Sequence, residues 1–329
     1  MQTQFRSQGP KLRAAVNGAV TYVKQRSGTM AKQPKPKGNA MRISDILKER
    51  QTFSFEIFPP RGDLPIEQAR EVSRALSEYR PDWISVTFSA GGSGNSGNTL
   101  TIGHDIEREL GVNALVHLTC MGATAAEVDS NLQAIRAAGI QNVLALRGDR
   151  RPGAQTVDFS YAADLIRRIK ETMPEMCVGA ACYPEGHVEC ESLEKSLEHL
   201  YLKQEAGADF LVSQLFFNNE DFYRFRELCL RYRIKIPVVA GIMPFTSVAQ
   251  IQRMAFTCGA SIPAKVVKRL VAAGDDKHAQ ARAGMEYAIE QICDLAANGV
   301  DGIHIYSMNH PEIGKATYDA LVECGYLNA

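Results

Sequence analysis

Glu56 is a lone acid inside a short apolar run, "TFSFEIF" at residues 52–58, which two prolines close. Side chains of a strand alternate between its two faces, so Phe55 and Ile57 share one face and Glu56 lies on the other. A carboxylate among aromatic rings loses hydration, which raises its pKa, and a value of about 6.5 would suit a general acid near neutrality. The alternative is a buried salt bridge, for example to Arg147, which would lower the pKa instead.

Other polar side chains stand at the ends of similar apolar runs farther along the chain. Each alone is compatible with an ordinary buried polar group. Parallel strands bring their carboxyl ends to one edge, however, so we expect these side chains to surround one site. They are Thr87, His117, Thr119, Arg147, Asp149, Tyr183, Gln214 and Ser307 to His310.

Eight β-branched or aromatic runs recur, and stretches with helical spacing lie between them. They cover residues 52–58, 83–88, 114–119, 142–147, 177–183, 209–217, 236–242 and 302–308. The first seven begin about 27 to 35 residues apart, the length of one strand and helix unit. The last interval is about twice as long and contains helical patterns at 246–256, 263–273 and 280–298.

This alternation predicts an α/β fold, a (β/α)8 TIM barrel with an extra helix before the last strand. In that fold, Ser54 and Glu56 would point into the barrel, since the outer strand face meets helices. A doubly wound open sheet is the alternative. It normally carries a glycine-rich turn after its first strand, and "FPPRGDLP" is not such a turn.

The charge is distributed unevenly along the chain. Lys+Arg and Asp+Glu number 37 each, but residues 1–40 hold eight basic residues and no acid, which leaves 29 against 37 for residues 41–329. We interpret residues 1–40 as a disordered basic extension and residues 41–329 as the barrel domain. An organellar presequence or a segment that binds anionic surfaces remains an alternative for the extension. The mildly acidic body argues against nucleic acid as a partner.

Composition also limits location and metal binding. No apolar run approaches the roughly 20 residues of a membrane-spanning helix, so we expect no membrane partner. There is no secretory signal, and the eight cysteines form no C-x-x-C pair, so we expect small buried thiols in the cytoplasm and no metal site. Because the chain stops about 20 residues past the last run, we also expect no second regulatory domain.

Eight motifs in order resemble the catalytic domain of the methylenetetrahydrofolate reductase family over about residues 42 to 325. They are "FSFEIFPP", "SVTFSAGGS", "HLTC", "LALRGD", "YPEGH", "LKQEAGADFLVSQLFF", "GIMP" and "IHIYSMN". The resemblance implies a (β/α)8 barrel that binds FAD. It also implies interconversion of 5,10-methylenetetrahydrofolate and 5-methyltetrahydrofolate with NAD(P)H by ping-pong hydride transfer, in one-carbon and methionine metabolism.

The resemblance also implies roles for single residues. Glu56 matches the general acid that opens the methylene bridge of the folate to a 5-iminium cation. Asp149 matches an acid beside flavin and pterin, although a turn residue after Gly148 is the alternative from the sequence alone. The matching substrate positions are Glu56, Thr87, Gln214, Gln250 and His310. The matching FAD positions are Thr87, Phe88, Ala90, His117, Arg147, Gly148, Asp149, Ala162, Tyr183, His187, His199 and Lys203.

Several positions depart from the family pattern. Phe88 lacks a polar tip and is followed by "SAGGSGNSGN", which is typical of a flexible lid and only weakly of a phosphate cradle. Ser196, Met254 and His310 stand where Asp, an aromatic residue and Arg are usual. A histidine is a weaker and titratable donor than arginine, so we expect altered affinity for folate or nucleotide rather than lost chemistry.

Two other function classes stay open. One is a flavin-free pterin-binding barrel that transfers a one-carbon or aryl group, and the other is a non-catalytic folate-binding paralogue. The sequence does not choose between NADH and NADPH or between the two directions of reaction, and it is compatible with a homo-oligomer.

Overall fold

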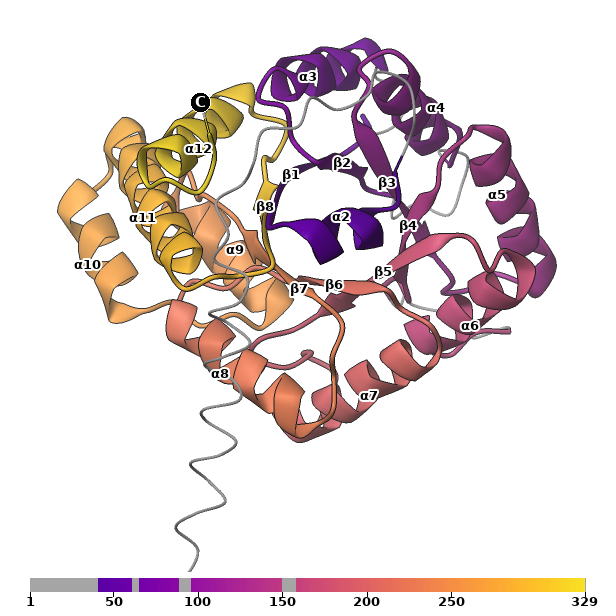
Figure 1. The fold of residues 1–329 in the computed structure, drawn as a ribbon. Helices are drawn as coiled ribbons and strands as arrows, with labels where there is room; N and C mark the ends of the chain where they lie inside the picture. The colour runs from indigo at the N-terminus through magenta and orange to yellow at the C-terminus, as the bar shows by residue number, and fades with distance from the viewer. Residues whose placement is uncertain (1–40, 61–64, 89–95, 150–157, 329) are drawn as a thin grey trace, which may run out of the picture.

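The strands of the protein close into one parallel barrel, which we describe from a computed structural model covering residues 41–60, 65–88, 96–149 and 158–328 (Figure 1). Neighbours pair in chain order, and β8 pairs with β1 to complete the closure. This confirms the predicted (β/α)8 barrel. The predicted basic extension lies outside these residues. The strands are β1 Thr52–Ile57, β2 Trp83–Val86, β3 Asn113–Thr119, β4 Asn142–Leu146, β5 Cys177–Cys182, β6 Phe210–Ser213, β7 Val238–Ile242 and β8 Gly302–Tyr306.

Helices surround the barrel on its outside (Figure 1). The interval between β7 and β8 contains three helices, α9 to α11, which confirms the predicted additional helix, and α10 packs against α11 outside the ring. The surrounding helices are α3 Glu67–Ser77, α4 Ser96–Arg108, α5 Ala125–Ala137, α6 Ala162–Thr172, α7 Leu193–Glu205, α8 Asn219–Arg231, α9 Val248–Cys258, α10 Ala264–Ala273, α11 Lys277–Ala297 and α12 Pro311–Glu323. Within the part of the chain described, every helix is too short or too polar to span a bilayer.

The two faces of β1 have opposite characters. Phe55 and Ile57 are buried in the apolar layer between strands and helices, together with Val72 and Leu76 of α3. The alternate side chains face the barrel interior, where Glu56 meets groups from other strands. The predicted orientation of Glu56 is therefore confirmed.

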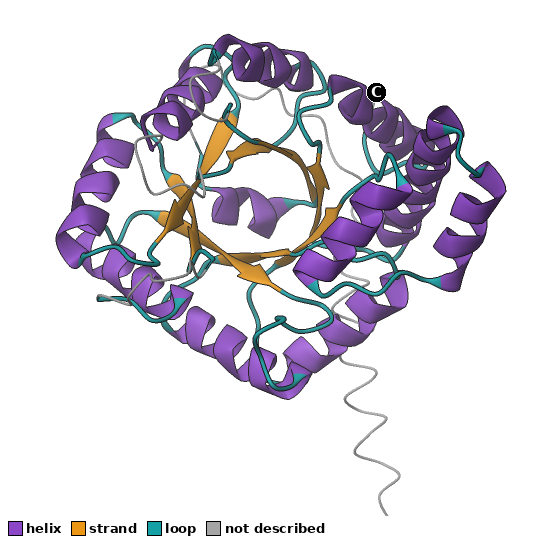
Figure 2. Cartoon of the chain, turned by 180° about the vertical axis from the view of Figure 1, so that it is seen from behind, coloured by secondary structure: helices purple, strands orange, loops and turns teal. Residues whose placement is uncertain are grey.

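A short helix, α2 (Ile43–Glu49), lies across the N-terminal end of the barrel (Figure 2). Its first N–H, from Ile43, donates to Asn142 Oδ1 at 2.8 Å. Ile43 and Leu47 then pack on Trp83 and other side chains that fill this end of the barrel. Because α2 and this apolar cluster fill that end, polar chemistry is left to the C-terminal end, where active sites of such barrels lie.

Candidate active site

Glu56 is the centre of a polar cluster inside the C-terminal half of the barrel. Its side chain is 20% exposed. The Ser85 hydroxyl donates to Glu56 Oε2 at 3.4 Å. His117 Nε2 lies 3.4 Å from the same oxygen and His304 Nε2 lies 3.9 Å from it. Strands β1, β2, β3 and β8 thus each contribute one side chain to the cluster.

The prediction of a raised pKa for Glu56 was wrong. Burial alone would raise the pKa, but the facing imidazole of His304, the charge of His117 and the Ser85 hydroxyl outweigh it and lower the pKa. The alternative of a salt bridge to Arg147 was right in direction but wrong in partner. Arg147 Nη1 donates to Glu189 Oε2 at 2.7 Å instead.

His304 and Ser85 were missed as partners of Glu56. His304 is 1% exposed and contacts Ser54 on the neighbouring strand β1 and Ser85 on β2. The signal was present in "GIHIYSM", because Ile303 and Ile305 mark the outer face of that strand and His304 alternates with them.

The segment after β8 holds the chain around Glu56. The Ser307 hydroxyl donates to the Glu56 carbonyl at 2.6 Å. The Asn309 side-chain amide makes two hydrogen bonds of 2.9 Å with the backbone of Phe58. Of the predicted residues 307–310, these two therefore fix the strand end that carries the acid. His310 is the N-cap residue of α12, has a side chain that is 52% exposed, and pairs with Glu312 at 2.9 Å.

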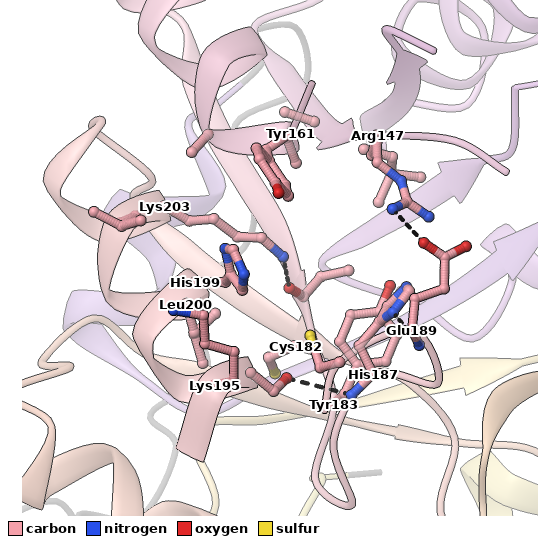
Figure 3. A pocket seen from close by; sticks show the side chains of 18 of the residues that line it. Arg147, Tyr161, Cys182, Tyr183, His187, Glu189, Lys195, His199, Leu200 and Lys203 are labelled. Carbon is pink, nitrogen blue, oxygen red and sulfur yellow. Dashed lines mark hydrogen bonds and ion pairs between the residues drawn. The ribbon is translucent and has the colours of Figure 1, made fainter. Parts of the chain in front are cut away.

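A cleft of about 400 Å³ lies between the ends of β4 and β5 and helices α6 and α7 (Figure 3). This volume is within the usual range for ligand sites. Tyr161 and His199 stack at 5.0 Å, and Tyr183 and His187 meet edge to face at 4.6 Å. Six predicted cofactor positions line it: Arg147, Ala162, Tyr183, His187, His199 and Lys203.

Four cationic side chains line the cleft, and two of them, Lys203 and Arg147, are predicted cofactor positions. Lys203 Nζ donates to the Ala181 carbonyl at 2.7 Å and lies 5.7 Å from the Tyr183 ring. Burial lowers the pKa of Lys203 to about 8, and no described carboxylate forms an ion pair with it. Arg147, the other predicted cation, is paired with Glu189. Two cations among aromatic rings fit the diphosphate and ring systems of a dinucleotide such as FAD.

The turn after β4 brings Asp149 to the same region. Gly148 has φ +86°, a conformation that favours glycine, and a Cβ there would lie 3.2 Å from Thr119 Cβ. Asp149 follows it, is exposed, and its charge acts on Arg147, Tyr183 and His187. The predicted neighbourhood of Asp149 and the cofactor residues is thus present.

Other predicted positions lie outside the cleft lining. Thr87 and Phe88 follow β2, where the Thr87 N–H donates to the Ile57 carbonyl at 3.0 Å. His117 contacts Glu56. Ala90 lies outside the described residues. The structure therefore divides the predicted FAD set among the cleft, the segment after β2 and, for His117, the barrel interior.

The two predicted glutamines have local partners. Gln214 Oε1 accepts from the Leu215 N–H at 2.8 Å. Gln250 Oε1 accepts from the Thr246 N–H and hydroxyl at 2.7 and 2.9 Å, next to the start of α9. The amide oxygen of each side chain is thus engaged, and its NH2 group is the part that remains to bind a ligand.

The chain is similar to known proteins over most of its length. A family model described as methylenetetrahydrofolate reductase matches residues 42–322. The 5,10-methylenetetrahydrofolate reductase of Escherichia coli is 32% identical over 263 residues, which cover 80% of this chain and 88% of that protein.

Methylenetetrahydrofolate reductase 1 of Schizosaccharomyces pombe is 34% identical over 292 residues, and methylenetetrahydrofolate reductase (NADH) 1 of Arabidopsis thaliana is 32% identical over 303 residues. The matches cover 85% and 87% of this chain but 48% and 50% of those proteins. The chain thus spans about half the length of these two relatives.

A solved structure supports the fold alone. It is an uncharacterized protein from Clostridium thermocellum, described as binding two copies of 5-methyl-5,6,7,8-tetrahydrofolic acid. The likeness has a TM-score of 0.58 at 15% identity and covers 87% of this chain and 99% of that one.

Proposed function

The chain belongs to the methylenetetrahydrofolate reductase family, and from that premise we propose that it is an FAD-dependent oxidoreductase of one-carbon metabolism. It interconverts 5,10-methylenetetrahydrofolate and 5-methyltetrahydrofolate with NAD(P)H by ping-pong transfer. The observation that carries the proposal is the cleft in which Arg147 and Lys203 stand among four aromatic rings, together with Glu56 in the C-terminal half of the same barrel. The names of the relatives support the reduction of methylenetetrahydrofolate.

The cleft is proposed to hold the cofactor. Arg147 and Lys203 bind its diphosphate, and the Tyr161–His199 and Tyr183–His187 pairs contact its rings. An anion next to Lys203 stabilises the ammonium, so binding raises the pKa of Lys203 from about 8. When bound, FAD accepts a hydride from one substrate and gives it to the next.

The groups around Glu56 are proposed to handle the folate. Glu56 donates the proton that opens the methylene bridge, and Asp149 stabilises the positive charge that develops on the pterin. Gln214 and Gln250 contact the substrate through their amide NH2 groups. Thr87 and His310 are further proposed contacts, and the exposed imidazole of His310 suits the carboxylate end of the folate.

Spectroscopy of the purified protein tests this proposal. We expect a yellow protein whose flavin absorbance is lost with a reduced nucleotide and restored by methylenetetrahydrofolate under anaerobic conditions. NADH is the first nucleotide to test, because it appears in the printed name of the Arabidopsis relative. Absence of flavin would favour a transferase barrel, and flavin that nucleotide cannot reduce would favour a non-catalytic folate-binding protein.

A further inference from the structure

The cysteines of the protein differ in their access to solvent. All eight lie within the described residues. Cys324, at the end of α12, is exposed, so the prediction of buried thiols is wrong for this residue. Cys293, on α11, is partly buried. The prediction is confirmed for the four cysteines that are fully buried, which are Cys120, Cys177, Cys182 and Cys229.

Cys293 and Cys324 meet at the last turn of α12. Helices α11 and α12 pack side by side (Figure 1). The Cys293 thiol donates to the Ala320 carbonyl at 3.7 Å, and the same carbonyl accepts the Cys324 N–H at 2.9 Å. The Cys324 thiol lies 3.7 Å from the next carbonyl, that of Leu321. The two sulfur atoms are therefore held against adjacent carbonyls of one helical turn.

The two thiols also contact each other. Burial and a hydrogen bond with Cys324 raise the pKa of the Cys293 thiol to about 12. Cys293 therefore stays protonated near neutrality, whereas Cys324 is open to solvent. Because the thiolate is the nucleophile and access limits its reactions, Cys324 is the sulfur that a soluble reagent meets first.

We propose that Cys293 and Cys324 are a modification site, at which small disulfide oxidants convert the two thiols into a reversible disulfide in the folded protein. The Cys324 thiolate attacks one sulfur of the oxidant and displaces the other half as a thiolate, which leaves a mixed disulfide. Cys293 then loses its proton and attacks Cys324 Sγ, which displaces the second half. The cysteines lose two electrons, and the oxidant becomes two thiols that carry the two protons.

The charge near the pair favours one kind of oxidant. The carboxylate of Glu323 precedes Cys324 in the chain, and its charge acts on Cys293. A negative charge repels an anionic reagent at short range. A neutral small disulfide is therefore expected to react faster here than the anionic glutathione disulfide.

The disulfide would restrain a helix that lies between contacts to both ends of β1. Before α12, the Ser307 hydroxyl donates to the Glu56 carbonyl. After α12, the buried Tyr326 donates its hydroxyl proton to the Thr52 carbonyl at 3.0 Å. A covalent link between α11 and α12 removes conformations from the state in which α12 has opened, so the helix should open less often.

Mass spectrometry of the folded protein after reaction with 2-hydroxyethyl disulfide, a neutral reagent, tests the proposal. After the remaining thiols are alkylated and the protein is digested, we expect two peptides joined through Cys293 and Cys324, which dithiothreitol separates. In Cys293→Ser the reagent should remain as a stable adduct on Cys324. An adduct that persists on Cys324 of the unaltered protein, or a Cys324 that does not react, would overturn the proposal.

Two controls separate the folded contact from chance pairing. Cys258→Ser, at the last residue of α9, should give the same joined peptides as the unaltered protein. In urea, where all eight cysteines compete, the yield of this pair should fall at least about tenfold, because the fold no longer holds the two sulfurs together. Equal yields in folded and unfolded protein would contradict a site built by the fold.

Hydrogen exchange measures the effect of the disulfide on α12. Amide exchange in residues 311–323 should be at least about tenfold slower in the oxidised protein than in the reduced protein, while α5 exchanges at the same rate in both. Equal or faster exchange of α12 after oxidation would contradict the restraint. Because these measurements use no flavin, folate or nucleotide, their outcome is independent of the proposed function.

Discussion

Lys203 is the cleft residue whose environment most clearly calls for an anion. Its ammonium is half-buried, lies 5.7 Å from the centre of the Tyr183 ring and donates to one carbonyl, and the loss of hydration there lowers its pKa to about 8. A charged group held this way costs stability until an opposite charge binds. The diphosphate of FAD would supply that charge.

Lys203→Met should therefore weaken FAD binding by about 10- to 100-fold, because one charge-assisted contact is lost while the side-chain volume is kept. Fluorescence titration of the flavin-free protein measures this. Lys195→Met is the matched control, since Lys195 also lines the cleft but is 51% exposed and paired with Glu198. Equal losses in the two variants would argue against a special role for Lys203.

Without flavin, the same substitution should stabilise the protein. The folded-state pKa of Lys203 is depressed to about 8 from 10.5, so the penalty is fully present below pH 8 and disappears as the pH rises to 10.5. Below pH 8 the variant should gain up to about 3 kcal/mol in free energy of unfolding. Urea denaturation of both proteins at pH 7 and pH 10 measures this gain. A gain of the same size at both pH values would contradict the prediction.

The residue-scale predictions succeeded where the signal was local. Period-two alternation placed Glu56 inside the barrel, and the strand ends placed Arg147 and Tyr183 on one cleft. The other four cofactor candidates on that cleft came from the family resemblance. The direction of the Glu56 pKa failed because its partners, His117 and His304, come from β3 and β8 and cannot be paired with β1 from sequence alone.

At the scale of elements, Glu107 shows how α4 is joined to β3. It accepts the Ala114 N–H at 3.2 Å, and burial raises its pKa from 4.5 to about 7. A raised folded-state pKa gives stability that is present below pH 4.5 and lost as the pH rises through 7. The contact between α4 and β3 should therefore weaken as the pH rises from 4.5 to 7.

Glu107→Gln should remove this dependence, because the amide cannot ionise and keeps an acceptor oxygen. We expect the free energy of unfolding at pH 8 to rise by about 1–3 kcal/mol relative to the parent, with little change at pH 4.5. Glu109→Gln, an exposed position on the segment after α4, is the control. If the free energy of unfolding changed with pH in the same way in the parent and in Glu107→Gln, the raised pKa of Glu107 would be contradicted.

Element boundaries were largely predictable, except for α2. All eight strands and the three helices before β8 match predicted segments, since hydrophobic periodicity is a local signal. Helix α2 has seven residues, too few for a clear period, and its position depends on Asn142 and on the barrel cluster around Trp83. Such distant partners are not visible in the sequence.

At the scale of the whole molecule, the barrel interior is filled by side chains that cross it. Tyr306 reaches from β8 to the Ser213 carbonyl at 2.6 Å and passes over Gly241 of β7. A Cβ at Gly241 would lie 2.7 Å from the Tyr306 hydroxyl and closer still to the Ser213 carbonyl. A glycine is therefore required for the barrel to close around this tyrosine.

Gly241→Ala should destabilise the barrel by about 1–3 kcal/mol, as overpacking does in other cores. Gly97→Ala on α4 is the control, because nothing lies within 4 Å of its added methyl group and alanine favours a helix. The melting temperatures of Gly241→Ala and Gly97→Ala are measured by thermal unfolding. Similar melting temperatures for both variants would show that the interior can relax.

The most direct test of the whole account is anaerobic stopped-flow of the unaltered protein and Glu56→Gln. Each is mixed first with NADH and then with methylenetetrahydrofolate while flavin absorbance is followed. The account predicts that both proteins lose flavin absorbance with NADH, that methylenetetrahydrofolate restores it in the unaltered protein, and that restoration in Glu56→Gln is at least about a hundredfold slower. Restoration at the same rate in both proteins would contradict the assignment of Glu56 as the acid at the barrel mouth.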